Sequence, residues 1–286
     1  MHPRNLARQF AATLAELRET WDVEYWPAGS IPARTAVAPG RSPSEGESPS
    51  VSMESGAEPR AAAVTSAPVH LPVAGEMRTQ AKQWTPATKL DYLRKRNVGD
   101  CQRCGLARSR TKIVFGVGNP EAKIMFVGEA PGADEDRQGE PFVGRAGARL
   151  NVWLAELGLS RDEVYIANVL KCRPPANRDP KPDEVEKCSP FLQAQIRAIA
   201  PRVIVALGRH AGMLLSRRDD LRLNAMRSAT LYYEVDVDAV ETRRIPIVVT
   251  YHPSYVLRQE GTSDGVEPAE RLVMQDLARA VALTNL

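Results

Sequence analysis

The chain has no long hydrophobic run and little net charge, and each shortage excludes a class of protein. Its longest apolar runs, such as residues 203–207, are far shorter than the roughly 20 residues that a membrane-spanning helix needs. No basic start followed by an apolar stretch and a small-residue cleavage site is present, so we expect a cytoplasmic protein without a membrane partner. The net charge of +3 indicates no particular partner by itself. With 286 residues, 43% of them hydrophobic, the chain can bury a substantial core.

Composition divides the chain into three segments. In residues 1–26, apolar side chains recur every three or four positions from Leu6 to Trp21, which predicts an amphipathic helix that packs on the chain's own core or on a protein partner. Residues 27–83 are rich in Pro, Ala, Ser, Gly and Glu, and such a segment cannot offset the entropy cost of ordering, so we predict a disordered linker. Residues 84–286 are then expected to form the folded domain, as a monomer.

In this third segment, predicted strands alternate with predicted helices. Helices are expected from Thr85 to about Asn97, over 146–157, from Pro182 onward and over 268–283. Continuous apolar strands between helices favour a parallel sheet covered on both faces, with ligands bound beyond the carboxyl ends of its strands. The fold expected is an α/β/α three-layer sandwich around a central, mostly parallel sheet of four strands at 123–127, 164–169, 202–207 and 247–250.

Positive charge gathers just before the first of these strands. Residues 89–112 contain eight Lys or Arg against two acids, Asp91 and Asp100. A basic segment of this density suits a phosphate backbone, whereas the alternative is an ordinary solvated helix face.

Only four cysteines occur, and in a chain without an export signal four cysteines are more typical of a metal site than of two disulfides. Cys101 and Cys104 are separated by two residues, so one tight turn can present both sulfurs to a single centre. Cys172 and Cys188 are separated by fifteen. A centre held by both pairs would join the basic segment to the α/β core, and the spacing alone leaves zinc and an iron–sulfur cluster open.

The loop after the first predicted strand carries glycines, carboxylates and one aromatic residue. Glycines permit positive φ and close approach of the backbone to a ligand, and Phe142 is expected to offer an aromatic face on the surface. A nucleotide-phosphate cradle is the competing interpretation. It is disfavoured because neither G-x-G-x-x-G nor G-x-x-x-x-G-K-[ST] occurs and the loop is acidic.

Four stretches together resemble the family 4, iron–sulfur-containing uracil-DNA glycosylases: 128–132 (GEAPG), 141–147 (PFVGRAG), 168–175 (NVLKCRPP) and 252–254 (HPS). The resemblance covers about residues 100–283. It implies that residues 84–286 form a catalytic domain that flips uracil out of single- or double-stranded DNA and hydrolyses its N-glycosidic bond, which leaves an abasic site. It also implies a [4Fe–4S] cluster held by Cys101, Cys104, Cys172 and Cys188.

Two other functions are alternatives to a glycosylase. A non-catalytic iron–sulfur module that binds DNA or senses damage is disfavoured, because binding alone would not need all three of His252, Asn168 and Phe142. A zinc-stabilised phosphoesterase is disfavoured by the lack of a His/Asp metal cluster. The extension before Trp84 and the long connection from Leu221 to Ile245 exceed the compact family pattern.

The resemblance also assigns roles to residues of the base pocket. His252 would donate to uracil O2, where negative charge develops as the bond to N1 breaks. Phe142 would stack on the base, and the amide of Asn168 would pair with O4 and N3–H. Backbone groups around Glu129 and Ala130 would hold the base and the attacking water, and Gly128 is expected among the substrate-binding residues.

Roles in water activation and DNA contact are implied in the same way. Glu129 and Glu135 rank above Asn177 for positioning water, and Glu135 would also crowd the C5 methyl of thymine. Leu257, in an expected minor-groove loop at 254–258, would fill the space left by the flipped base or else cap the core. Contacts to phosphate are expected from Arg258, Arg173, Arg178 and Lys171.

Overall fold

The computed structural model describes residues 84–236, 242–261 and 265–285. The helix predicted at 1–26 and the linker predicted at 27–83 lie outside the described residues. None of the helices in the described ranges has the length and apolarity to span a bilayer.

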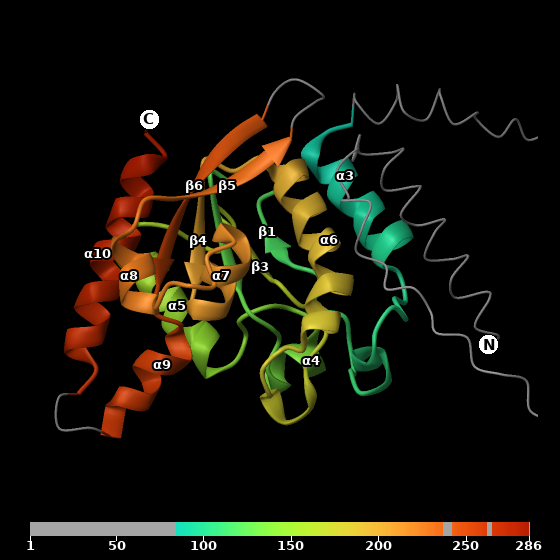
Figure 1. The fold of residues 1–286 in the computed structure, drawn as a ribbon, viewed down its shortest axis with the longest axis horizontal. Helices are drawn as coiled ribbons and strands as arrows, with labels where there is room; N and C mark the ends of the chain where they lie inside the picture. Colours follow the sequence, from blue (N-terminus) through green and yellow to red (C-terminus); the bar gives the residue numbers. More distant parts are fainter. Residues whose placement is uncertain (1–83, 237–241, 262–264, 286) are drawn as a thin grey trace, which may run out of the picture.

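A six-stranded sheet forms the centre of the fold, in the order β1-β3-β2-β4-β6-β5 (Figure 1). The four inner strands are parallel and the two edge strands are antiparallel to their neighbours. The inner strands contain the apolar runs read from the sequence, and β2, β3 and β4 are buried along their whole length because helices cover both faces. The strands are β1 (Val117–Gly118), β2 (Ile124–Gly128), β3 (Tyr165–Asn168), β4 (Val203–Leu207), β5 (Leu231–Asp236) and β6 (Thr242–Thr250).

The four strands expected from the sequence are the four inner strands, but the predicted count of four was wrong. The edge strand β1 has only two residues, too few to produce a recognisable pattern. The other edge strand, β5, lies in the stretch read as a long connection. Its buried Leu231 and Val235 are separated by exposed Tyr232 and Glu234, so it lacks the apolar run of an inner strand. It pairs with β6, which begins at Thr242 and is longer than expected.

Two helical layers enclose the sheet (Figure 1). Successive side chains of β2 point to opposite faces: Met125 and Val127 join the core beneath α6 and α7, and Phe126 joins the core beneath α5, α9 and α10. The first layer contains α3 (Pro86–Tyr92) with the π-helical turn η1 (Leu93–Val98), α6 (Pro182–Ile199), α7 (Arg209–Ser216) and α8 (Leu223–Ser228). The second contains α5 (Arg145–Glu156), α9 (Pro253–Arg258) and α10 (Glu267–Leu283).

The predicted helices begin where their capping residues indicate. The Thr85 side chain accepts the amide N–H of Thr88 at 3.2 Å and so caps α3, which continues through η1 to Val98. Pro182 occupies the first turn of α6, where Glu184 accepts the N–H of Lys181 at 2.9 Å. Shorter helical segments lie in the loops: η2 (Gly105–Arg108), α4 (Ala133–Gln138), η3 (Pro175–Asn177) and η4 (Gln259–Gly261).

The carboxyl ends of the parallel strands meet at one edge of the sheet. Gly128 at the end of β2 pairs in register with Asn168 at the end of β3, and Leu207 of β4 pairs with Thr250 of β6. The loops that leave this edge carry nearly every residue to which the sequence assigned a role.

Candidate active site and cysteine centre

Four predicted base-contacting residues converge at the carboxyl edge of the sheet. A methyl group placed on Gly128 would lie 2.6 Å from the Phe142 ring and would also overlap the amide oxygen of Asn168. The rings of Phe142 and His252 have centroids 5.7 Å apart. Only a glycine at position 128 therefore lets the aromatic ring, the amide and the imidazole come together.

Asn168 presents an unpaired acceptor at this point. The side chain is 2% exposed, and its Oδ1 has no hydrogen-bond partner among the described residues. A buried acceptor left unpaired costs roughly 1–3 kcal/mol. The amide is therefore arranged for a ligand with an N–H donor.

Phe142 differs from expectation because its ring is buried, at 5% exposure, and does not lie on the surface. Its backbone has φ +54°, a left-handed conformation that costs a bulky residue roughly 1–3 kcal/mol. The Arg161 guanidinium holds this turn, donating to the carbonyls of Pro141 at 2.7 Å and Phe142 at 3.2 Å. Gly147 passes so close to the Phe142 carbonyl that any Cβ there would collide with it.

His252 caps α9, and its protonation is fixed by the surrounding structure. The N–H of Ser254 donates to Nδ1 of His252 at 3.1 Å, so the proton of the neutral ring resides on Nε2. Burial lowers the pKa of His252 to about 4, and the imidazole is therefore neutral at physiological pH. The site thus contains a neutral N–H donor.

Glu135 is committed to the backbone of its own loop. One carboxylate oxygen accepts the N–H groups of Val143 at 2.9 Å and Gly144 at 3.0 Å, and the other accepts Gly132 N–H at 3.1 Å. These bonds join the two ends of the glycine-rich loop, which favours an organising role over the predicted activation of water.

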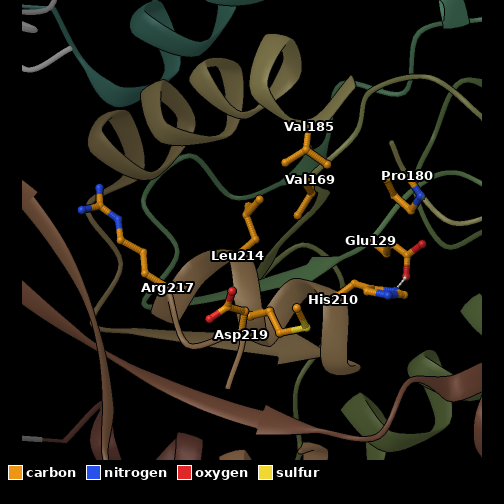
Figure 2. Close-up of a pocket in the computed structure, with 9 residues that line it drawn as sticks. Glu129, Val169, Pro180, Val185, His210, Leu214, Arg217 and Asp219 are labelled. Carbon is orange, nitrogen blue, oxygen red and sulfur yellow. Dashed lines mark hydrogen bonds and ion pairs between the residues drawn. The ribbon is translucent and has the colours of Figure 1, made fainter. Parts of the chain in front are cut away.

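Glu129 contacts a histidine that the sequence analysis missed. His210, in the first turn of α7, hydrogen-bonds to the Glu129 carboxylate, and this bond raises the pKa of His210 above its ordinary value. The position of His210 in the sequence could have indicated a functional role, because His210 closely follows the carboxyl end of β4, as His252 follows β6. Figure 2 shows the pair at one side of a cavity of about 380 Å³, also lined by Val169, Leu214 and Asp219.

A cation could also be held beside this pair. Oxygen atoms of Glu129 and Asp179 and a ring nitrogen of His210 lie within 4.8 Å of one another. Glu129 already has a hydrogen-bond partner in His210, so the geometry requires no metal ion there.

The structure also places three other residues to which the sequence assigned a role. Asn177 is exposed, with φ +54°, and its Oδ1 accepts Arg173 Nε at 2.8 Å. Leu257 is half-buried within α9, because Pro253 at the first turn starts a helix where a loop was expected. Its insertion into the minor groove stays a prediction. Ala130 is half-buried against the core next to α6 and α7.

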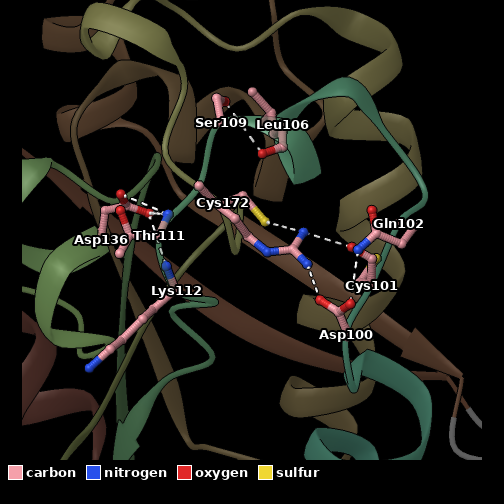
Figure 3. A network of polar contacts seen from close by, with 10 residues as sticks. Asp100, Cys101, Gln102, Leu106, Ser109, Thr111, Lys112, Asp136 and Cys172 are labelled. Atoms are coloured by element: carbon pink, nitrogen blue, oxygen red, sulfur yellow. Dashed lines mark hydrogen bonds and ion pairs between the residues drawn. The ribbon is translucent and has the colours of Figure 1, made fainter.

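The four cysteines line one small pocket, and none forms a disulfide. Cys101 and Cys104 precede η2, Cys172 follows β3, and Cys188 lies in α6, so the pocket joins segments far apart in the chain. Figure 3 shows Cys101 and Cys172 on facing segments. Two N–H donors point at sulfur: Arg110 at Cys172, 3.7 Å, and the backbone of Lys171 at Cys188, 3.2 Å.

The chemistry of this pocket fits a metal centre. Burial raises the pKa of Cys172 to about 11 and that of Cys188 to about 12, so thiolates here need a cation to stabilise them. Four converging sulfurs with N–H groups directed at them suit either a zinc ion or an iron–sulfur cluster.

Part of the predicted phosphate-binding surface is internal. Arg110 is 7% exposed and donates to the Cys101 carbonyl at 2.6 Å and to Asp100 at 2.5 Å. Lys171 is 1% exposed, so its predicted contact with phosphate is wrong. Arg178 is paired with Glu184 at 2.6 Å.

Comparison with known proteins agrees with this arrangement. Residues 115–277 match the model of the uracil DNA glycosylase superfamily. A type-4 uracil-DNA glycosylase of Archaeoglobus fulgidus is 48% identical over 175 residues, which cover 59% of this chain and 86% of the relative. A type-4 enzyme of Thermotoga maritima is 41% identical, with 64% and 88% covered, and a type-5 enzyme of Pyrobaculum aerophilum is 36% identical, with 48% and 63% covered. The chain belongs to the uracil DNA glycosylase superfamily.

Proposed function

We propose that this protein is a DNA repair enzyme that removes uracil from DNA by hydrolysing the bond between uracil N1 and deoxyribose C1′. One observation carries the proposal: the buried amide of Asn168, whose Oδ1 has no partner among the described residues, lies with Phe142 and the neutral His252 at one end of the sheet. A pyrimidine turned out of the duplex would satisfy this amide.

Recognition of the base rests on Asn168 and Phe142. The amide would accept uracil N3–H through Oδ1 and donate to O4 through its NH₂ group, a pattern that cytosine does not complement. The Phe142 ring, held by its strained turn, would stack on the base, and Gly128 would allow the close approach of the backbone.

His252 would stabilise the departing base. The electron pair of the C1′–N1 bond leaves with uracil, and the developing negative charge is shared with O2. The neutral imidazole would direct its Nε2–H at O2 and stabilise this charge through a hydrogen bond, keeping its proton.

Glu129 is our candidate for positioning the attacking water. It directly follows Gly128 at the carboxyl end of β2, the strand end at which the base-contacting residues converge. The water oxygen forms the new bond to C1′, and the proton it releases would pass to Glu129. We propose that Glu135 acts indirectly, by holding the loop. Among the three candidates for activating water, Asn177 has the weakest support.

We propose that the cysteine centre holds a [4Fe–4S] cluster, as the family 4 resemblance implies. When bound, the cluster would cross-link the segment before η2 to β3 and α6, and the four sulfurs line one pocket from those segments. The protein would act as a monomer in the cytoplasm, with Leu257 near the gap in the DNA stack.

Release of free uracil tests the proposal. Purified protein is incubated with single- and double-stranded oligonucleotides that contain one uracil, with the matched thymine and cytosine oligonucleotides as controls. We expect free uracil and an alkali-labile abasic site only from the uracil substrates. Tight binding to uracil-containing DNA without base release would instead favour the non-catalytic DNA-binding module.

A further inference from the structure

Lys171 is a buried lysine between the two sites. It lies three residues after Asn168 and directly before Cys172 in the sequence, and it is 1% exposed. Its Nζ donates to the Asn168 carbonyl at 2.7 Å and to Gln195 Oε1 at 2.6 Å. Lysine is almost never fully buried unless it is paired, so this position requires an explanation.

Both hydrogen-bond partners of the ammonium are neutral. Among the described residues, no carboxylate forms an ion pair with Lys171, and the residue itself lines the pocket of the four cysteines. The backbone N–H of Lys171 also donates to the Cys188 sulfur at 3.2 Å. Lys171 therefore contacts both sites: its ammonium holds the Asn168 carbonyl, and its backbone N–H holds a sulfur of the cysteine centre.

The ammonium holds the end of β3, where Asn168 pairs with Gly128 of β2 on one side and has no β1 partner on the other. The edge strand β1 pairs only with Tyr165 and Ile166, so the Asn168 carbonyl lies beyond its end. Gln195, on the other side of the ammonium, is itself fixed by bonds to the Phe115 carbonyl at 2.9 Å and the Tyr165 hydroxyl at 3.3 Å. The lysine thus anchors Asn168 to a rigid part of α6.

We propose that Lys171 is a positioning residue that couples the cysteine centre to uracil recognition. Its ammonium fixes the backbone of Asn168, and a cluster bound by the four cysteines would place anionic sulfur next to this buried lysine. The inference rests on the proposed function, because it assigns Asn168 to the base and a cluster to the cysteines. It gives the centre a role in specificity, in addition to cross-linking the fold.

The test compares Lys171→Met with Lys187→Met in the full-length protein purified with its metal centre. Lys187 also lines the cysteine pocket, but its side chain is 40% exposed and pairs with Asp183 on the surface of α6. Three quantities are measured: iron and sulfide per chain, the reduction potential of the centre, and kcat and KM for uracil release. Lys171→Gln, which retains an N–H donor without the charge, serves if the methionine variant does not fold.

For Lys171→Met we expect wild-type iron content, because the backbone N–H to Cys188 remains. Loss of the nearby positive charge should make the reduction potential more negative, and kcat/KM for uracil should fall at least tenfold. Lys187→Met should resemble the wild type in iron content and in kcat/KM, and its reduction potential should shift less than that of Lys171→Met because its half-exposed charge is screened by solvent. The coupling is overturned if Lys171→Met and Lys187→Met are indistinguishable in potential and in kcat/KM.

Failure of the proposed function would be seen separately, in the wild-type protein. If the wild type releases no uracil, the glycosylase assignment fails, whereas the potentials of the two variants still test the contact between Lys171 and the centre. If the wild type contains zinc, the cluster assignment fails, and Lys171→Met must still lower kcat/KM with full zinc content for the coupling to stand.

Discussion

The backbone N–H of Ser254 donates to Nδ1 of His252, and this bond determines which ring nitrogen carries the proton. Because burial also keeps the ring uncharged, Nε2–H is available as a neutral donor. The catalytic histidine that the sequence predicts is thus placed by the same turn that starts α9.

Replacing His252 should affect the chemical step and leave folding largely unchanged. His252→Ala removes a preorganised donor, and such a loss typically lowers kcat by about 10²–10³-fold. Single-turnover release of uracil measures the effect, with thermal unfolding as a check on the fold. Ser254→Ala keeps the backbone N–H, so it is the matched control and should retain wild-type rates; a similar loss in both variants would contradict the role of His252.

His252 should also make the protein less stable in acid. Its folded-state pKa of about 4 lies below the usual value of 6.5, so the unfolded chain binds a proton first as the pH falls. The stability is complete above pH 6.5 and declines between pH 6.5 and about 4, by a total of about 3 kcal/mol.

Urea unfolding across this pH range measures the decline. His252→Asn has no group that titrates there, so its stability should fall less steeply than that of the wild type. Parallel curves for the two proteins would show that the imidazole is not buried in its neutral form.

The Glu129–His210 hydrogen bond should weaken as the pH rises. Because the pKa of His210 is raised, the pair is fully formed below pH 6.5 and is lost as the pH rises through the folded-state pKa. His210→Asn should lower uracil release at pH 6.5 by about three- to fivefold, since a half-exposed, charge-assisted hydrogen bond contributes roughly 1 kcal/mol. Arg217→Gln, which alters the same cavity without touching the pair, is the control.

Loop geometry is tested by Gly147→Ala. The added methyl group would collide with the Phe142 carbonyl and displace the ring predicted to stack on uracil. We expect kcat/KM to fall at least about tenfold, the size of effect that follows from roughly 1.4 kcal/mol of lost transition-state binding. Gly105→Ala, where nothing lies within 4 Å of the added methyl, should be close to wild type. Equal activities would mean that the Phe142 turn is free to shift.

The parts of this structure that the sequence predicted are those with a local signal. Apolar runs revealed β2, β3, β4 and β6 because inner parallel strands are buried on both faces. The edge strand β5 was missed because its outer side chains are polar or exposed. The resemblance to a family indicated the base-contacting residues, and the structure brings Gly128, Phe142, Asn168 and His252 together.

The residues that were misread depend on partners far away in the chain. Lys171 was expected to contact phosphate, yet Gln195, which holds its ammonium, is 24 positions away on α6. His210 meets Glu129 across 81 positions. No local pattern states whether a cation faces solvent or a buried acceptor, so these assignments required the tertiary structure.

The cysteine centre makes the last prediction. Cys101→Ser should lose the metal and much of the stability, because the four sulfurs join the segment before η2 to β3 and α6. Without the centre, this join depends on the packing of Leu106 in the core and on contacts such as Arg103 over the Phe191 ring. Metal content, visible absorption and thermal unfolding measure the loss. Ser109→Ala, in the same segment but outside the pocket, is the control. A Cys101→Ser protein that unfolds at the wild-type temperature would mean that the α/β core holds this segment without the metal centre. The centre would then act only through Lys171 and its contact with Asn168.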